Sequence, residues 1–296
     1  MSATLIADVQ DQAQAVWAPI MVDELVESAV VPSVVNTDYD GQIKQLNDTV
    51  YISMLRHANA SKKTVGAGHD VFDSEKMVTV RTPLVADTVI TASFEIDSLI
   101  DLQTQLGNPD GKSKIRQALV KGLELKLNEH IYSLVAPSTS NPDHLINGVT
   151  DFNAGQLLAV RKLAAQAKWM RDGNWYAVLD PSYMNDLMSS TQLASLDFVN
   201  DQPTIGGQFA GARYGFKIME DNSDAMSALS PTAASEDYGL FFHKDFLYLA
   251  MQQEPTFEIS SLHALKQHGY LVSVKMILGA TLGIEGDKKH VVVYNV

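Results

Sequence analysis

The sequence predicts an α+β protein, and three patterns support this prediction. Two extended runs, residues 42–55 and 78–96, are rich in Val, Ile, Thr and Tyr and alternate in part between apolar and polar side chains, as strands do. Apolar residues recur at helical spacing over residues 112–135. Near the C-terminus, residues 270–284 and 290–294 form apolar runs that are typical of strands.

The composition describes a globular, acidic chain. Its 296 residues allow one large domain or two ordinary ones, and a hydrophobic content of 46% is enough for a sizeable core. The formal net charge of −13 argues against binding nucleic acid through a broad basic face, because such binding needs Lys and Arg to neutralise phosphates. The absence of cysteine excludes disulfides, thiolate zinc sites and a cysteine nucleophile.

No targeting or membrane signal is evident in the sequence. The N-terminal residues lack the basic and apolar regions of a signal peptide. The apolar stretch at residues 270–284 is too short to span a bilayer, and it contains Lys275. We therefore expect a soluble protein that is made in a cytoplasm.

The N-terminal third of the chain has the character of an arm. Residues 5–30 carry apolar side chains at roughly helical spacing, interrupted at Pro19, and could form a helix that docks on its own subunit or an arm that docks on a neighbour. The two extended runs that follow form the legs of a longer arm, with the polar, glycine-dotted residues 56–70 as its tip. Because an isolated two-stranded hairpin is marginally stable in water, this arm must lie on something else unless it folds back as a meander.

Three helices are predicted in the middle of the chain. The longest covers residues 112–135 and would be about 36 Å long at ~1.5 Å per residue. A second begins after its cap, Asn153, and continues to about residue 171. A third has Asp180 as its N-cap and Pro181 at its first position, where proline is favoured.

Strands and loops separate these helices from the C-terminus. Short strands are expected at residues 175–179, 216–219 and 240–250. Residues 203–215 form a loop with four glycines, and residues 223–237 form a loop rich in Ser and Ala. A turn at residues 285–287 joins the last two strands. The second half of the chain is therefore a mixed region of helices, strands and loops.

The glycine-rich motifs do not match a cofactor site. Gly111-Lys112-Ser113 is similar to the end of a phosphate-binding loop, but Leu106 stands where that motif needs its first glycine. The glycine loop at 203–215 has no dinucleotide-binding fingerprint and precedes a strand rather than a helix. No nucleophile elbow is present.

The titratable pairs are equally weak as catalytic or metal sites. His263 and His268 are five residues apart, so they would lie on different faces of a helix, which is unfavourable for a zinc site. Asp97 and Asp101 are one helical turn apart and could act together in general acid–base catalysis. A better explanation of this spacing is that Asp97 caps a short helix and Asp101 is solvated in its first turn. We expect no enzyme activity, no cofactor and no metal.

Five segments of the chain point to a family: VVPSVVNTDYDGQIKQLNDTVYI at 30–52, TASFEIDSLIDLQTQ at 91–105, NWYAVLDPSYMNDLMSS at 174–190, GGQFAGARYGFKIMEDN at 206–222, and HALKQHGYLVSVKMILGATLG at 263–283. In this order they resemble the major capsid proteins of tailed bacteriophages, which have the Hong Kong 97-type shell fold. The segments span nearly the whole chain in the family's order. None of them is a catalytic signature, so the specificity lies in the set.

The resemblance implies a Hong Kong 97-like major capsid fold with five parts. Residues 1–40 would be the N-terminal arm, 41–93 the extended β-hairpin loop (E-loop) that lies over an adjacent subunit, 94–149 the peripheral domain with its long spine helix, 150–255 the axial domain, and 256–296 the return to the peripheral domain. Loops of the axial domain, including residues 203–215, would face the fivefold and quasi-sixfold axes.

The resemblance also implies a function and a set of partners. Copies would self-assemble into pentamers and hexamers that close into an icosahedral shell around phage double-stranded DNA, held by interfaces on the order of 2,000 Å² or more. The acidic balance would repel the enclosed DNA and let it slide. Partners would be further copies of the chain, a separate scaffolding protein, a portal protein and, in some shells, decoration proteins, with no membrane. The protein would assemble in the bacterial host cytoplasm and reside in the virion.

Contacts between subunits are expected at the loop tip and in the glycine loop. The candidate residues are Lys62, Lys63, Gly66, His69, Gly206, Gly207, Phe209 and Arg213. A scaffolding protein separate from this chain is expected because the arm begins within a few residues of Met1.

Two other functions remain open on the sequence alone. An encapsulin-like nanocompartment shell would share the fold and enclose cargo enzymes instead of a genome. A cytoplasmic hydrolase, with Asp and His groups assembled from distant positions, would instead be a monomer or small oligomer. Particle size under the electron microscope separates the hydrolase from the two shells.

Overall fold

The computed structural model describes residues 30–44, 48–62, 74–97, 109–135, 145–146, 148–190, 212–229, 237–262 and 268–295. The chain divides into two compact units, of which the larger holds Glu27–Ile90, Leu123–Thr256 and Lys275–Val296, and the smaller holds the rest. The predicted N-terminal helix, most of the glycine loop and the segment that follows Asp97 lie outside the described residues.

The larger unit is built on a mixed six-stranded sheet. Its strands, in spatial order, are β4 (Leu145–Ile146), β11 (His290–Tyr294), β8 (Tyr238–His243), β5 (Trp175–Leu179), β7 (Phe216–Glu220) and β6 (Ala212–Arg213). The central strand β8 is antiparallel to both β11 and β5, while β5 and β7 are parallel. All five residues of β11 are buried, which explains its continuous apolar sequence.

Two helices of the larger unit contribute to the core of this sheet. They are α4 (Ala154–Gln166) and α5 (Pro181–Ser189), and both begin at the caps that the sequence predicts. The Asn153 side chain accepts hydrogen bonds from two backbone N–H groups of α4, and the Asp180 side chain accepts one from Tyr183. Aromatic rings fill the core between these elements: Phe152, Trp169, Trp175, Tyr183, Phe216 and Phe241.

Helix α4 is shorter than the prediction, which extended it to about residue 171. Lys168 adopts a left-handed conformation with φ 59°, and the N–H of Trp169 bonds back to the carbonyl of Ala164. This is a Schellman-type end, and it returns Trp169 to the core. A lysine in place of the usual glycine concealed the helix end in the sequence.

Helix α3 (Pro109–Val135) is one continuous helix and begins three residues before the predicted start at 112. Five of its buried apolar residues recur every four positions: Ile115, Leu119, Leu123, Leu127 and Ile131. This spacing places them on one face of the helix, which is the pattern that predicted the helix.

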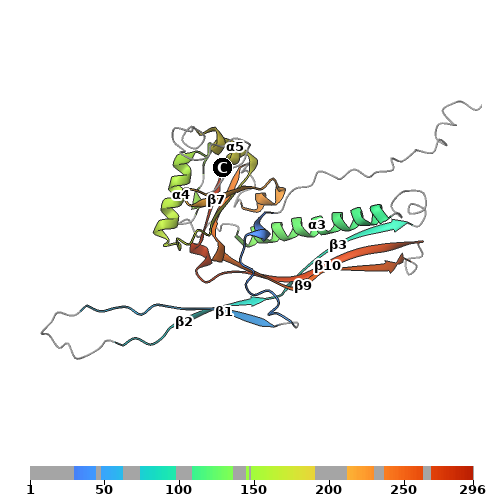
Figure 1. Ribbon diagram of the computed structural model, residues 1–296, viewed down its shortest axis with the longest axis horizontal. Helices are drawn as coiled ribbons and strands as arrows, with labels where there is room; N and C mark the ends of the chain where they lie inside the picture. The colour runs from blue at the N-terminus through green and yellow to red at the C-terminus, as the bar shows by residue number, and fades with distance from the viewer. Residues whose placement is uncertain are drawn as a thin grey trace, which may run out of the picture. The chain divides into compact units, whose positions relative to one another are not determined.

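The two predicted extended runs form three strands, not two. β1 (Thr49–Leu55) and β2 (Thr79–Val85) pair antiparallel over their full length, as Figure 1 shows. The second run then breaks at Ala86 and Asp87, and its remainder, β3 (Thr88–Asp97), joins a separate three-stranded sheet. The prediction of one continuous second leg was therefore wrong, because two different sheets share it.

The three-stranded sheet has the order β3, β10 (Gly269–Leu282) and β9 (Leu247–Ser261). The single strand predicted at 240–250 is divided between β8 and β9 by a short 3-10 helix, η5 (Lys244–Phe246). The His243 side chain caps η5 by accepting the N–H of Asp245, which ends β8 at that point. Other short 3-10 helices are η1 (Val31–Ser33), η4 (Asp224–Leu229) and η7 (Gly286–Lys288). The predicted loop at 223–237 thus contains η4.

Candidate interaction surface

The base of the β1–β2 hairpin is buried in the larger unit. Ile52 of β1 and Leu84 of β2 pack with Ile43, Ala250 and Ile284 in one apolar cluster. The approach of the backbones is close. A Cβ added to Gly279 would collide with the carbonyl oxygen of Val85, so this position requires glycine.

Farther along the hairpin, this burial stops. The pair Met54 and Val80 is only half-buried, and every described residue from 55 to 62 and from 74 to 79 is exposed. We call these residues the distal ribbon. They include three large apolar side chains, Leu55 at 60% exposure, Met77 at 77% and Val78 at 52%. The distal ribbon therefore has no stabilising core within its own subunit. A two-stranded hairpin without such a core is only marginally stable in water.

The two legs of the distal ribbon are joined by polar contacts. The N–H of Arg56 donates to the carbonyl of Val78 at 3.1 Å. The Glu75 carboxylate accepts from both the backbone N–H and the side-chain amide of Asn59, at 3.2 and 3.1 Å. These hydrogen bonds, the side-chain one first, lower the pKa of Glu75. The legs are thereby held in register without any buried apolar contact.

The charge of the distal ribbon is opposite to that of the whole chain. It carries three cations, Arg56, Lys62 and Lys76, against the single carboxylate of Glu75, whereas the chain has a net charge of −13. An exposed, cationic and partly apolar ribbon on an acidic protein has the composition of an interaction surface.

The structure places two of the eight residues that the sequence predicts as contacts. Lys62 is exposed in the distal ribbon, and Arg213 is half-buried at the end of β6. The others lie outside the described residues: Lys63, Gly66, His69, Gly206, Gly207 and Phe209. Sequence reasoning missed Leu55 and Met77, although the alternation along β1 could have indicated that Tyr51, Ser53 and Leu55 share an outward face.

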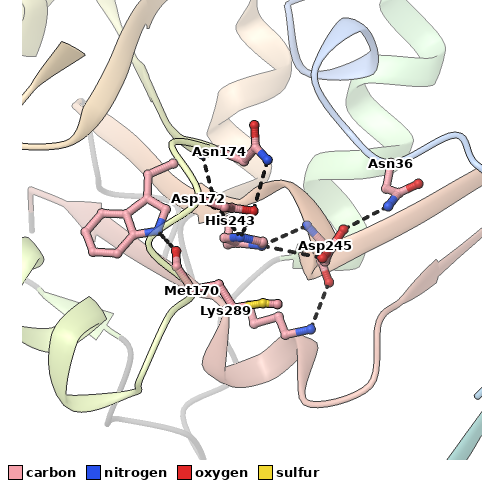
Figure 2. A network of polar contacts seen from close by, with 8 residues as sticks. Asn36, Met170, Asp172, Asn174, His243, Asp245 and Lys289 are labelled. Carbon is pink, nitrogen blue, oxygen red and sulfur yellow. Dashed lines mark hydrogen bonds and ion pairs between the residues drawn. The ribbon is translucent and has the colours of Figure 1, made fainter. Parts of the chain in front are cut away.

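A polar network holds the segment that leads into the hairpin (Figure 2). Asp245 lies between Asn36, which donates to its Oδ1 at 2.8 Å, and His243, whose Nδ1 accepts the N–H of Asp245 at 3.2 Å. Because Nδ1 accepts, the proton of the neutral ring is on Nε2, which faces both carboxylate oxygens of Asp172 at 3.2 Å. Lys289 donates to the carbonyl of Asp245 at 3.4 Å.

The environment of Asp172 keeps it ionised. Burial acts to raise its pKa, but hydrogen bonds from Asn174 and the contact with His243 outweigh burial, and the pKa is held below its ordinary value. The network therefore joins a carboxylate, an imidazole and a second carboxylate in a row. Its geometry fixes Asn36 to the end of β8.

This row of groups is a poor active site. The depression beside it, lined by residues such as Trp169, His243 and Lys289, measures about 80 Å³, far below the several hundred Å³ of small-molecule pockets. Among the described residues no cluster of three or more His, Asp or Glu side chains could hold a metal. The same part of the chain contains no helix that is long and apolar enough to cross a membrane.

A second buried network links α3 to the end of β7. The Tyr132 hydroxyl donates to Asp221 Oδ2 at 2.6 Å, and the Asn128 amide donates to the same oxygen at 3.0 Å and to Ser223 Oγ at 3.2 Å. Burial, followed by the charge of Asp221, raises the pKa of Tyr132 well above its ordinary value. Asp221 is fully buried, and its Oδ1 accepts the N–H of Ser223 at 2.9 Å, so each of its side-chain oxygens has a hydrogen-bond donor.

Comparisons with known proteins agree with this architecture. A family model described as phage capsid protein matches residues 127–293. A solved structure from Mycobacterium phage Che8 has a TM-score of 0.70 at 16% identity, covering 95% of this chain and 96% of that chain. The capsid asymmetric unit of cyanophage Pam1 has a TM-score of 0.71 at 16% identity, covering 99% and 98%. The capsid of cyanophage P-SCSP1u has a TM-score of 0.68 at 13% identity, covering 97% and 94%. No curated protein matches the chain.

Proposed function

Because this chain belongs to the family of phage capsid proteins, we propose that its copies assemble as pentamers and hexamers into the icosahedral shell that encloses the double-stranded DNA of a tailed phage. The fold is that of phage capsid structures over nearly the whole chain. The family is structural and not enzymatic, which agrees with the absence of a catalytic signature and removes the hydrolase alternative.

One observation supports assembly above the others: the distal ribbon buries nothing in its own subunit. Leu55 and Met77 are largely exposed there, and each would contribute about 1.5–3 kcal/mol if fully buried against a neighbour. In a monomer, these exposed apolar side chains would contribute nothing to stability. In an assembly, contact with other copies would bury them.

The proposal includes the division of the chain into the five parts that the resemblance implies. The hairpin of β1 and β2 would be the E-loop, α3 the spine helix of the peripheral domain, and the six-stranded sheet with α4 and α5 the body of the axial domain. Residues 1–40 would form the arm, and residues 256–296 the return to the peripheral domain.

The partners follow from the same premise. A scaffolding protein, a portal protein and, in some shells, decoration proteins would join this chain in the virion, after assembly in the host cytoplasm. The net charge of −13 supports a wall that does not bind its DNA tightly. The comparisons name phages, so an encapsulin-like compartment is not proposed.

A hairpin-shortening variant tests the proposal. Arg56 and Val78 form the last backbone hydrogen bond along the ribbon, so residues 57–77 can be replaced by Asn-Gly, a two-residue turn suited to closing an antiparallel pair. We expect the purified variant to melt within a few degrees of the parent chain, because the described residues in this range, 57–62 and 74–77, are all exposed and bury nothing in the core. Negative-stain microscopy and sedimentation should show shells for the parent and only subunits or small oligomers for the variant.

Three outcomes would contradict the proposal. Normal shells from the shortened chain would show that the ribbon is not an assembly element. Loss of folding would show that the ribbon supports its own subunit. Small particles from the parent chain itself, under every condition and with the scaffolding protein present, would refute the shell.

A further inference from the structure

His243 lies where the chain passes from one sheet to another. It is the last residue of β8 in the six-stranded sheet, and the short helix η5 that follows it leads directly into β9 of the three-stranded sheet. Its side chain is only 3% exposed, and Figure 2 shows the ring between Asp172 and Asp245. A change in the hydrogen bonding of this ring therefore acts at the junction between β8 and β9.

Asn36 attaches the segment ahead of the β1–β2 hairpin to this junction. Its backbone pairs with the start of β9, through its N–H to the carbonyl of Leu247 at 3.4 Å and its carbonyl to the N–H of Leu249 at 2.9 Å. Asn36 is buried, and its side-chain amide donates to Asp245 Oδ1 at 2.8 Å. The Asp245 carboxylate therefore lies beside both Asn36 and the histidine ring.

In the neutral ring of His243, both nitrogens have a partner. Nε2 carries the proton and faces the two Asp172 oxygens at 3.2 Å, and Nδ1 accepts the N–H of Asp245 at 3.2 Å. A second proton can enter only at Nδ1, where it would face the N–H of Asp245, so that two donors oppose each other. Another acceptor for this proton is near, because Asp245 Oδ2 lies 3.9 Å from Nδ1.

The Asp245 carboxylate cannot bond to both neighbours in its present position. A charged hydrogen bond from Nδ1 is about 2.7–2.9 Å long, so Oδ2 has to move roughly 1 Å toward the ring. Asn36 is not free to follow, because its backbone is bonded to β9. The movement therefore stretches the hydrogen bond from Asn36 to Oδ1 and leaves a buried amide without its acceptor, which is unfavourable.

We propose that His243 is a proton-dependent switch: the neutral ring leaves Asp245 bonded to Asn36, whereas the protonated ring draws the Asp245 carboxylate to Nδ1 and loosens the attachment of Asn36 to the start of β9. Histidine is the side chain that ordinarily changes its charge between about pH 5 and 8. The segment ahead of the hairpin is thus held at neutral pH and released in mild acid. The inference concerns the single subunit and does not depend on the proposed function.

Other charged groups surround the ring. The same depression is lined by one further carboxylate and three lysines: Glu285, Lys168, Lys288 and Lys289. The lysines disfavour a charged ring, whereas Asp172, Asp245 and Glu285 favour it. Burial, followed by the charge of Asp245, raises the pKa of Tyr248 to about 12, so this hydroxyl stays neutral in mild acid. The neighbouring strand β11 contributes a second buried histidine, His290, whose Nδ1 lies 2.9 Å from the Gly286 carbonyl.

Hydrogen exchange of the unassembled, full-length subunit tests the switch. The amide hydrogens of Asn36 and Leu249 form the two bonds between the segment and β9, so their protection reports the attachment. Protection is measured by mass spectrometry between pH 7.5 and 5.5 and corrected for the intrinsic exchange rate. We expect both amides to lose protection by about tenfold or more at pH 5.5, while the amides of β5, in the interior of the six-stranded sheet, keep theirs.

Two substitutions assign the effect to the ring. Asn is a favoured N-cap, so His243→Asn can still accept the N–H of Asp245 but no longer titrates. We expect its protection at Asn36 and Leu249 to stay within about twofold between the two pH values. Asp172→Asn keeps an oxygen acceptor for Nε2 but removes a charge that favours the protonated ring. The midpoint of the loss should therefore move to lower pH by about half a unit or more.

The parent chain alone can refute the switch. Equal protection of Asn36 and Leu249 at both pH values would show that protonation leaves the attachment intact. A loss of the same size in His243→Asn would assign the effect to another titrating group, such as His290. An unchanged midpoint in Asp172→Asn would show that the proton does not enter the ring that Asp172 faces. Each of these results overturns the proposal.

Discussion

Replacing Asp180 by Asn should stabilise the subunit at neutral pH, although Asp180 is a helix cap. Its side chain accepts the N–H of Tyr183 at the start of α5. Burial, opposed in part by that hydrogen bond and reinforced by the charge of Asp237, raises the pKa of Asp180 from 3.8 to about 6. Asn is as good a cap as Asp and carries no charge, so Asp180→Asn removes the penalty and keeps the cap.

The size and the pH window follow from the shift. A carboxyl with a raised pKa in the folded state favours folding when protonated, so its favourable contribution is fully present below about pH 3.8 and is lost as the pH rises through about 6. Two pKa units correspond to ~3 kcal/mol, which partial exposure of the group reduces to about 1–2 kcal/mol. At pH 7.5 the Asn variant should therefore be more stable than the parent by about 1–2 kcal/mol.

Denaturant unfolding of unassembled subunits, followed by tryptophan fluorescence, measures this difference. Trp169 and Trp175 lie in the core cluster that includes α5, so they report the relevant transition. The gain should vanish at pH 4. Asp180→Ala is the control, because it removes both charge and cap and so should gain less by about 1 kcal/mol. A destabilised Asn variant at pH 7.5, or a gain that is the same at pH 4, would refute the reasoning.

Two further substitutions test contacts elsewhere in the subunit. Tyr132→Phe removes a donor to the buried carboxylate of Asp221 and should lower the free energy of unfolding by about 1.5–3 kcal/mol, measured by urea unfolding; an unchanged midpoint would show that Asp221 does not need it. Gly279→Ala should cost about 2–3 kcal/mol through its clash at the hairpin base, whereas Gly122→Ala, within α3 and with open space around it, should gain about 0.5–1 kcal/mol; the reverse order of melting temperatures would contradict the close approach.

The elements that the sequence predicted well are those with local causes. Helix α5 begins at the predicted Asp180 and Pro181, because a cap and a first-turn proline act within one turn of the chain. The helix predicted over 112–135 is present, because its apolar residues repeat on one face of α3. The α+β class follows from the same local patterns.

The elements that were predicted poorly depend on partners far away in the sequence. Residues 78–96 were predicted as one strand. They are divided at Ala86 and Asp87, because β2 pairs with β1 whereas β3 belongs to another sheet. Residues 240–250 also read as one strand and are divided by η5. Strand preference indicates an extended, half-buried segment but not which sheet the segment joins, so the division could not be predicted.

The sequence indicated an exposed tip but not the apolar side chains beside it. The polar stretch at 56–70 indicated a tip, and its described part is exposed. The exposed side chains of Leu55 and Met77 were not predicted, because the sequence alone does not show whether a single Leu or Met is buried or exposed. The contact role of the predicted tip and loop residues stays a prediction.

The structure supports the ribbon at one end only, and this asymmetry bears on how strongly it can bind. Gly279 and the Ile52–Leu84 pair fix the hairpin base, and Asn36 ties the preceding segment to both Asp245 and β9. Binding costs free energy for every group that must become ordered. A base that is already packed, with Asn59 and Glu75 holding the legs together farther out, leaves mainly the exposed side chains to be ordered on docking. In the proposed contact with another copy, ordering the hairpin would therefore offset little of the free energy gained by burying its exposed apolar side chains.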